Sequence, residues 1–333
     1  MGIKQTITLL LFLFSLIVII GSIEVLLGQQ LPITHYYYDG VNVVDINVIK
    51  ARPIVFSFNT NNLAATIAML SPLFFYSIYK FDNILLKIYF FFVSCISFSL
   101  IVITTSRTGI IGIELSFVIY LIYCIYRVKK TGLKGLLFPM LLIISLTFLR
   151  FNSINFMNIH SVNNSTQSEA NNLLSSKMNA LTEEKLEVGS SGSLNVRFTI
   201  ISDVVNGVLI KEKHLLGYGV GNVEEYLKNQ DNTHKVFSPH CYSIEILGDF
   251  GVPGVILYGI YYLYLLISNI VIGIKETNIP CIASATGLIA FSMVSFGPSS
   301  ITYVFSYWLL MAIAISCIQV YKYDNSILNT KIK

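Results

Sequence analysis

Charged residues are scarce in this chain of 333 residues, because Asp, Glu, Lys and Arg together make up only 12% of it. An ordinary soluble domain has about twice that share, so this composition excludes the usual soluble globular class. Hydrophobic residues make up 54% of the sequence instead, and the mean hydropathy is +0.68. The chain is therefore predicted to be a polytopic membrane protein.

Motifs for metal, redox and nucleotide chemistry are also missing. The 5 cysteines form no Cys-x-x-Cys pair, which supports neither a zinc site nor a redox pair. No Asp-x-Asp occurs either. The run Gly217-Tyr218-Gly219-Val220-Gly221-Asn222 lacks the third glycine of a dinucleotide-binding loop, and no predicted strand precedes it. A tight backbone turn is the better interpretation, and we expect neither a cofactor nor a protein-bound metal.

Apolar runs long enough to cross about 30 Å of hydrocarbon recur about eight times along the chain. They cover residues 6–27, 62–79, 84–104, 109–126, 133–149, 241–266, 279–296 and 302–321. The first run is longer than the apolar part of a signal peptide and no cleavage pattern follows it, so we expect a retained helix. The sequence thus predicts an all-α integral membrane fold, a polytopic bundle with one large extracytoplasmic loop.

The basic residues of the short connections predict the orientation of these spans. If Lys4 is cytoplasmic, most of the other basic residues in short connections share its side, namely Lys80, Lys87, Arg127, Lys129, Lys130, Lys134, Lys275, Lys322, Lys331 and Lys333. The opposite face has only Arg107 in a short connection. Both termini are therefore expected in the cytoplasm. The net charge of +4 reflects this bias, so we expect no nucleic-acid partner.

This orientation divides the chain into three parts: transmembrane helices 1–5 in residues 1–149, the large extracytoplasmic loop in 150–240, and transmembrane helices 6–8 with a cytoplasmic tail in 241–333. The loop is too polar for a core from about residue 163 to 193. After Ser193, an expected N-cap, apolar residues recur at spacings of 3 and 4: Leu194, Phe198, Ile201, Val205 and Val208. This pattern predicts an amphipathic helix on the membrane or against the bundle.

Several charges fall where the predicted spans meet the membrane surface. Arg107 follows a span at its outer end, and Glu114 lies two helical turns deeper on the same face. Ionisable groups inside a membrane are functional candidates; the alternative is an arginine that snorkels and a glutamate paired within the bundle. Glu24 is interpreted as a snorkelling boundary residue. His240 stands where the polar loop meets an apolar run, and a histidine there can transfer protons beside lipid.

The segment around His240 carries a family resemblance. It reads His240-Cys241, nine residues, then Gly251-Val252-Pro253-Gly254, and it resembles the signature of the O-antigen ligase and polymerase superfamily, which includes capsule and teichuronic acid polymerases. In the ligases this signature reads His, then Asn, Ser or Gln, nine residues, Gly, two residues, then Gly, Thr or Tyr. The upstream order of Arg197, the run 216–222 and Pro239 looks like the loop order of the family.

Segments 56–64 and 106–109 are similar to segments of Gram-positive members, so the resemblance spans roughly residues 53–254. Two features depart from the family pattern. Cys241 replaces the usual amide or hydroxyl residue after the histidine, which removes a local hydrogen-bonding group. The chain also has fewer predicted spans than is typical of the family.

The resemblance implies a glycosyl-group transferase at the outer face of the cytoplasmic membrane. A sugar on a polyprenyl pyrophosphate already has a good leaving group, so the enzyme must deprotonate an acceptor hydroxyl and neutralise the departing charge. His240 fits the general base, since an unperturbed histidine titrates near neutrality. Arg107 and Arg197 fit the pyrophosphate, with bidentate geometry and in place of a metal.

The loop order of the family adds Gly217, Gly219 and Asn222 to Arg107 and Arg197 as substrate-binding candidates. Glu245 and Asp249 have no role in the resemblance, and structural or solvated carboxylates are the favoured interpretation. The expected partners are a polyprenyl-pyrophosphate-linked oligosaccharide, the lipid bilayer and other polysaccharide-assembly proteins.

Three functions stay open from the sequence. The main hypothesis is a polymerase that joins lipid-linked oligosaccharide repeats, and the sibling hypothesis is a ligase that attaches a finished glycan to a final acceptor. A different class is a transporter or flippase for the lipid-linked sugar. Transporters usually have polar groups at the membrane midplane and often show internal repeats, and the sequence shows neither.

Overall fold

The computed structural model describes residues 3–31, 49–57, 59–156, 186–298, 300–302 and 304–331. All regular secondary structure in those ranges is helical, and no strand occurs in them. The predicted all-α class is confirmed. The helices are α1 (Ile3–Leu27), α3 (Thr60–Lys80), α4 (Ile84–Thr104), α5 (Arg107–Thr131), α6 (Leu137–Asn152), α8 (Ser193–Val205), α9 (Val223–Gln230), α10 (Tyr242–Lys275), α11 (Ile279–Val294) and α12 (Phe305–Lys331).

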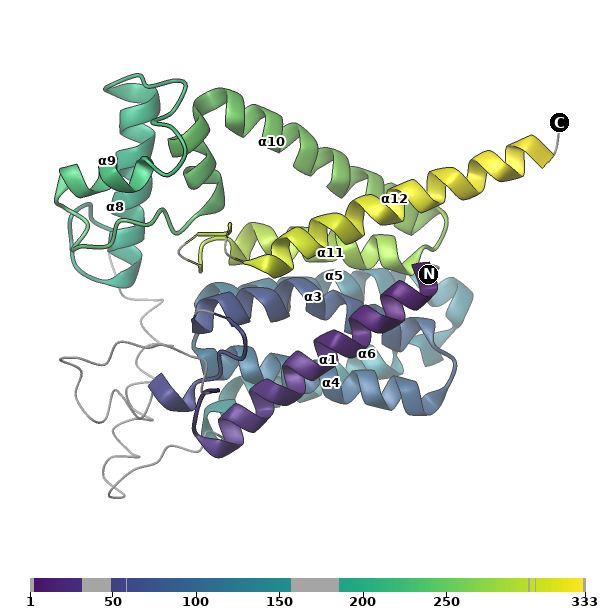
Figure 1. Cartoon of the computed structure of the whole chain (residues 1–333). Coiled ribbons are helices and arrows are strands. Elements are labelled where there is room, and N and C mark those ends of the chain that lie inside the picture. Colours follow the sequence, from purple (N-terminus) through teal and green to yellow (C-terminus); the bar gives the residue numbers. More distant parts are fainter. Residues whose placement is uncertain are drawn as a thin grey trace.

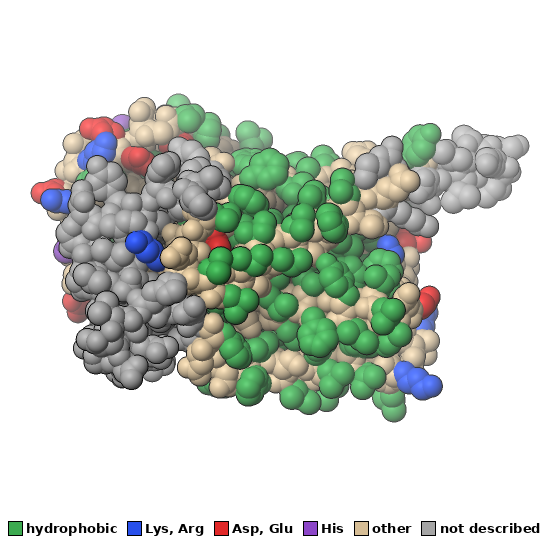
Figure 2. All heavy atoms as spheres, turned by 60° about the horizontal axis from the view of Figure 1, so that its bottom comes forward, with side chains coloured by type: hydrophobic (Ala, Val, Ile, Leu, Met, Phe, Trp, Pro, Cys, Tyr) green, Lys and Arg blue, Asp and Glu red, His purple; other side chains and the backbone are tan. Residues whose placement is uncertain are grey.

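Eight helices among these residues are long and apolar enough to cross a membrane. Seven of them contain α1, α3, α4, α5, α6, α10 and α12 and agree with seven predicted spans. Figure 2 shows hydrophobic side chains over the middle of one face and charged side chains towards its two ends. This distribution matches a polytopic protein whose middle lies in hydrocarbon and whose ends lie in water.

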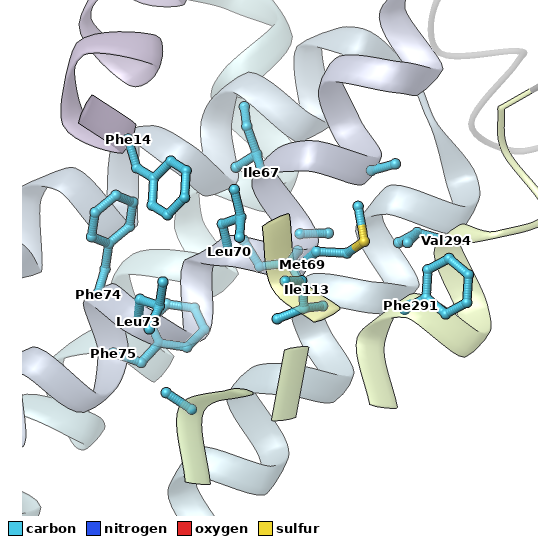
Figure 3. Close-up of a cluster of buried hydrophobic side chains, with 14 of the residues drawn as sticks. Phe14, Ile67, Met69, Leu70, Leu73, Phe74, Phe75, Ile113, Phe291 and Val294 are labelled. Atoms are coloured by element: carbon cyan, nitrogen blue, oxygen red, sulfur yellow. The ribbon is translucent and has the colours of Figure 1, made fainter. Parts of the chain in front are cut away.

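The bundle is organised around α3. This helix is buried along nearly its whole length and packs against α1, α4, α5, α11 and α12. Figure 3 shows its apolar side chains meeting Phe14 of α1 on one side and Phe291 and Val294 of α11 on the other. Phe75 of α3 also makes an edge-to-face contact with Phe117 of α5, with ring centroids 5.8 Å apart. Helix α3 therefore forms the centre of the main hydrophobic core.

The predicted span at residues 279–296 is shorter than expected. Helix α11 ends at Val294 after 16 residues, which is about 24 Å at 1.5 Å per residue and less than the hydrocarbon thickness. The chain then runs to α12 without regular structure in residues 295–298, 300–302 and 304. Helix α11 packs against α3, α5, α10 and α12. Non-helical backbone such as the segment after α11 is tolerated in a membrane protein where protein surrounds it.

The predicted span at residues 241–266 corresponds to α10, which is not one continuous helix. Helix α10 is interrupted at Gly251, whose backbone angles are φ 64° and ψ −157°. Residues 242–250 therefore form a separate first part, visible in Figure 1 as a change of direction next to α8 and α9. The second part, residues 252–275, is about 36 Å long at 1.5 Å per residue and can cross the membrane alone. Pro253 opens it, where a missing N–H is harmless.

Helix α8 lies across one end of the bundle. Figure 1 shows it beyond the ends of α3 and α5 and turned across their direction, so we treat it as a cap of the bundle although its segment Ser193–Ile210 is apolar enough for a span. It packs against α9 and α10. A second hydrophobic core joins these three helices, made of Val196, Ile200, Val204, Val208, Val223, Leu227 and Leu247.

Two expectations for α8 are corrected. Ser193 is its first helical residue, and the N-cap is Gly192, which makes no side-chain capping hydrogen bond. The buried stripe consists of Val196, Ile200, Val204 and Val208. Of the predicted stripe members, Val208 is therefore buried and Val205 packs beside it, whereas Leu194, Phe198 and Ile201 line a cavity. The segment carries two apolar stripes that meet at Val208, one spaced by 4 and 3 and the other by 4, and the contact with α9 and α10 decides which one is buried.

Among the described residues, basic side chains predicted to be cytoplasmic lie in the last turns of α3, α5 and α10, at the other end of the bundle. Arg127 donates hydrogen bonds to the Tyr79 hydroxyl (3.4 Å) and to Thr277 Oγ1 (3.0 Å), which joins α5 to α3 and to the α10–α11 connection. In Figure 1, α1 begins and α12 ends at this same end, away from α8. The side of the membrane that each end faces stays a prediction.

Candidate active site

The turn between α4 and α5 places Arg107. Thr105 has a left-handed backbone (φ 56°) and reverses the chain after α4. The Ser106 side chain then caps α5 by accepting a hydrogen bond from the Gly109 N–H (3.4 Å). Arg107 is the first residue of α5, and its position is therefore set by a capped helix terminus.

Arg197 lies in α8, whose N-terminal approach is fixed by two buried polar side chains. Asn195 Oδ1 accepts from the Glu187 N–H (3.1 Å), and its Nδ2 donates to the Ser191 carbonyl (3.1 Å). Thr199 Oγ1 accepts from the Gly189 N–H (2.8 Å). Burial lowers the pKa of Arg197, and the nearby charge of Arg107 lowers it further. The two predicted arginines are therefore brought together by elements far apart in the sequence.

His240 is half-buried beside Arg197 and has a left-handed backbone with φ 50°, which is uncommon outside glycine. Burial and, second, the positive charge of Arg197 lower the pKa of His240 from 6.5 to about 4, although hydrogen bonds to the backbone of Gly297 and Pro298 act in the opposite direction. Its Nδ1 is buried and has no hydrogen-bond partner among the described residues. The imidazole is therefore neutral near pH 7, the form that accepts a proton.

A cavity of about 650 Å³ opens between α8 and the ends of α3, α4 and α5. Its described lining includes no aspartate or glutamate, but it includes three arginines, Arg52, Arg107 and Arg197. Hydroxyl and amide groups and an apolar rim complete it: Thr60, Asn61, Thr104, Thr105, Ser106, Thr108, Ser193, Ile111, Leu186, Leu194, Phe198, Ile201 and Phe296. Three guanidinium groups, with no carboxylate in the described lining, are the side chains that suit a phosphate or carboxylate ligand.

His240 does not line this cavity, but it lies close to Arg197, which does. The charge of Arg197 affects the imidazole, and Arg197 itself lines the cavity. The connection between α11 and α12 contributes to both places, because Phe296 is in the cavity lining and the next two residues contact His240. The three residues predicted to be catalytic therefore share one end of the bundle.

Arg52 was missed by the sequence analysis. It precedes α3 on a segment without a recognisable motif, and its Nη1 donates to Thr105 Oγ1 (3.2 Å) in the turn that places Arg107. The one signal in the sequence was its place in the long connection between the first two predicted spans, which the orientation puts on the face opposite Lys4. Nothing local in the sequence indicates that its side chain reaches the same cavity as Arg107.

Glu24 is not a snorkelling residue. Its side chain is buried (2% exposed), and its carboxylate accepts three backbone hydrogen bonds, from Leu31 (2.9 Å), Ile54 (2.9 Å) and Val55 (2.8 Å). A buried carboxylate is tolerated when it is hydrogen-bonded in this way. Glu24 fixes the segment that carries Arg52, and hydropathy alone could not distinguish this role from a boundary position.

The glycine run forms the predicted tight turn, with positive φ at Gly217, Gly219 and Gly221. The turn docks on the kink of α10, because the Tyr218 and Gly219 N–H groups donate to the Gly248 (2.7 Å) and Asp249 (3.1 Å) carbonyls. The Asn222 side chain donates to the Tyr218 carbonyl (3.0 Å). Neither Gly217, Gly219 nor Asn222 is among the described residues of the cavity lining, and their substrate-binding role stays a prediction.

The remaining acidic candidates make structural contacts. Glu114 is paired with Arg150 of α6 (3.7 Å) and does not line the arginine cavity. The Glu245 carboxylate accepts from the Ser300 hydroxyl (2.5 Å), and Asp249 accepts from the Gly221 N–H (3.1 Å). No group of three or more His, Cys, Asp or Glu side chains that could hold a metal occurs within the described ranges.

Comparison with known proteins gives one match. A family model described as O-antigen ligase matches residues 92–259. The matched region contains Arg107, Arg197 and His240, whereas Glu24 and Arg52 lie before it. No curated protein and no solved structure matches the chain.

Proposed function

Because the chain belongs to the O-antigen ligase family of polytopic membrane proteins in polysaccharide biosynthesis, we propose that it polymerises oligosaccharide repeats carried on polyprenyl pyrophosphate. The product would be a cell-surface polysaccharide of the capsule, O-antigen or teichuronic acid type. One observation carries this proposal: a cavity with three arginines and no lining carboxylate among the described residues lies beside a neutral histidine.

In the proposed reaction, an acceptor hydroxyl attacks the anomeric carbon of the donor sugar. The bond from that carbon to the pyrophosphate oxygen breaks, and its electron pair leaves with the polyprenyl pyrophosphate. The hydroxyl proton passes to His240, which is neutral near pH 7 because burial and Arg197 lower its pKa to about 4. A neutral imidazole beside the acceptor can serve as general base.

Arg107 and Arg197 neutralise the charge that develops on the pyrophosphate. A guanidinium group binds phosphate oxygens in a bidentate geometry and keeps its charge. Fixed positive charges that are already in position stabilise a developing anion without the reorganisation that water needs. We propose that these arginines make the reaction independent of a divalent metal.

The proposed reaction takes place at the outer face of the cytoplasmic membrane, with both termini in the cytoplasm. Two observations support this placement: the cavity lies at the end of the bundle opposite Arg127, and α1 begins and α12 ends at the Arg127 end. The positive-inside rule assigns the more basic end to the cytoplasm. A lipid-linked donor could then reach the arginines from the outer leaflet.

A ligase is the second candidate, because the matching family model is described as O-antigen ligase. The purified protein in lipid, given only polyprenyl-pyrophosphate-linked repeats and excess chelator, tests the choice. A polymerase produces a ladder of longer lipid-linked glycans, whereas a ligase leaves the substrate unchanged until a different acceptor is added. A ladder that needs a divalent ion contradicts the role of the arginines. Movement of the lipid-linked sugar between leaflets without any product identifies a transporter.

A further inference from the structure

Arg52 reaches the cavity from a part of the chain that the family model does not cover. Its guanidinium donates to Thr105 Oγ1 (3.2 Å), the left-handed residue that also sets the position of Arg107. It lines the same cavity as Arg107 and Arg197. The shared cavity thus has contributions from three separate elements: the segment before α3, the α4–α5 turn and α8.

The backbone around Arg52 is held from both sides. After Arg52, the N–H groups of Ile54 and Val55 donate to the buried Glu24 carboxylate. Before and at Arg52, the Gln30 amide donates to the carbonyls of Ile49 (2.8 Å) and Arg52 itself (3.0 Å). Withdrawing a carboxylate from water is costly unless several donors satisfy it. Glu24 and Gln30 therefore fix the segment of residues 49–55, and Arg52 of this segment lines the cavity.

We propose that Arg52 is a third substrate-binding residue of this cavity, which contacts the diphosphate group bound there, and that Glu24 is its positioning residue. This inference rests on the proposed function for the identity of the ligand. Guanidinium groups that line one cavity can bind several oxygens of the same phosphate ester. A diphosphate ester carries two negative charges when it binds and three after it has left the sugar, so a third guanidinium group matches the charge of the leaving group.

The charge balance of the reaction supports a third arginine. A lipid-linked sugar diphosphate is a diester, and each of its two phosphorus atoms carries one negative charge. When the bond to the sugar breaks, the electron pair stays on the diphosphate oxygen and adds one negative charge. The leaving group therefore gains charge during the reaction, and a third fixed cation stabilises the product side most.

The test uses the purified full-length protein in lipid and two probes, inorganic pyrophosphate and farnesyl diphosphate. Arg52→Gln should weaken the binding of both probes about ten-fold or more, since it removes a charge-assisted contact, and Arg52→Lys should weaken it less. Lys50→Gln is the matched control: it removes the same charge from an exposed residue of the same segment that does not line the cavity, and affinity should stay within about two-fold. Thermal unfolding confirms that each variant is folded.

The role of Glu24 needs a measurement that general destabilisation would not change. Glu24→Gln replaces one carboxylate oxygen with an amide NH2 group, which cannot accept a hydrogen bond from a backbone N–H. Arg52 should then lose its position, and farnesyl diphosphate should bind more weakly. In the double variant with Arg52→Gln, affinity should fall no further than in Arg52→Gln alone, because both changes remove one interaction. Additive losses would show that Glu24 does not act through Arg52.

The outcomes separate this inference from the proposed function. A folded Arg52→Gln variant with wild-type affinity for both probes overturns the role of Arg52, even if the wild-type protein forms a glycan ladder. If the variant loses affinity but the wild-type protein forms no glycan, the anion site stands and the polymerase proposal fails. Tighter binding of farnesyl diphosphate than of inorganic pyrophosphate supports a lipid-linked ligand, and the reverse order contradicts it.

Discussion

The backbone of Gly217 lies directly against the backbone of Gly251. A Cβ added to Gly217 would come within 2.6 Å of the Gly251 nitrogen and 2.7 Å of the Asp249 carbonyl carbon. The neighbouring Val252 N–H donates to the Leu215 carbonyl (2.9 Å). The loop before α9 and the kink of α10 are therefore one packed unit. This unit lies beside the second hydrophobic core, which α8, α9 and α10 form.

Gly251→Ala should destabilise this unit strongly. Gly251 has φ 64° and ψ −157°, a region essentially restricted to glycine, with a cost of about 1–3 kcal/mol for other residues. A Cβ there would also collide with the Leu215 carbonyl oxygen. Gly259→Ala is the matched control on the same helix, since nothing lies within 4 Å of a Cβ at that position. Thermal unfolding in detergent should separate the two variants, and equal stability would contradict a tightly packed kink.

His240→Ala should abolish glycan formation while the protein level in the membrane stays normal. The loss of a general base typically lowers the rate by about 10²–10⁴-fold. His214→Ala is the control, because His214 is an exposed loop histidine that contacts Glu212 (3.5 Å) and the ring of Tyr218 and does not line the arginine cavity. Full activity of the His240 variant would reduce this residue to a structural role.

Arg197→Lys should be nearly as damaging as the loss of His240. Lysine keeps the positive charge but loses the planar fork that binds two phosphate oxygens together. The rate of glycan formation, measured at saturating donor, should fall, and the affinity for farnesyl diphosphate should fall with it. Activity close to that of the wild-type protein would show that charge alone is enough at this position.

The membrane class and seven of the eight helices that are long and apolar enough to cross a membrane were predicted from the sequence. This is possible because a helix that crosses hydrocarbon must be a long apolar run, which is visible in the sequence. The sequence also identified Arg107, Arg197 and His240 through the family resemblance, and the structure places them at one end of the bundle. Their catalytic roles stay predictions.

The features that the sequence analysis missed depend on contacts between distant residues. The buried stripe of α8 is chosen by packing against α9 and α10, and the break in α10 depends on the docking of residues 215–219 at Gly251. Arg52 enters the cavity because Glu24 holds its segment. The spacing of apolar residues and the number of basic residues carry no information about which distant residues come into contact.

Reporter fusions should confirm the predicted orientation. A fusion after Lys129, near the basic end of α5, should report a cytoplasmic location, and a fusion after Lys213, in the exposed loop between α8 and α9, should report an extracytoplasmic one. The reason is the excess of basic residues at the Lys129 end. A cytoplasmic signal at Lys213 would place the arginine cavity on the wrong side for the proposed donor and would contradict the mechanism as well.

The dependence of the rate on pH should show an unusually low acid limb. As a general base, His240 must be neutral, so activity is lost as pH falls through its pKa. Burial and then the charge of Arg197 lower that pKa from 6.5 to about 4. The acid limb of kcat/KM, which reports the free enzyme, should therefore lie well below pH 6.5.

The acid limb of kcat should lie at higher pH than that of kcat/KM, because kcat reports the enzyme with bound donor. The negative charges of a bound diphosphate offset Arg197, which is the second cause of the low pKa of His240, and protonation of the imidazole then becomes easier. Both profiles can be measured with the same lipid-linked donor between about pH 4 and pH 8. Coincident limbs would mean that the diphosphate does not bind near Arg197, and an acid limb of kcat/KM at or above pH 6.5 would mean that His240 is not the base.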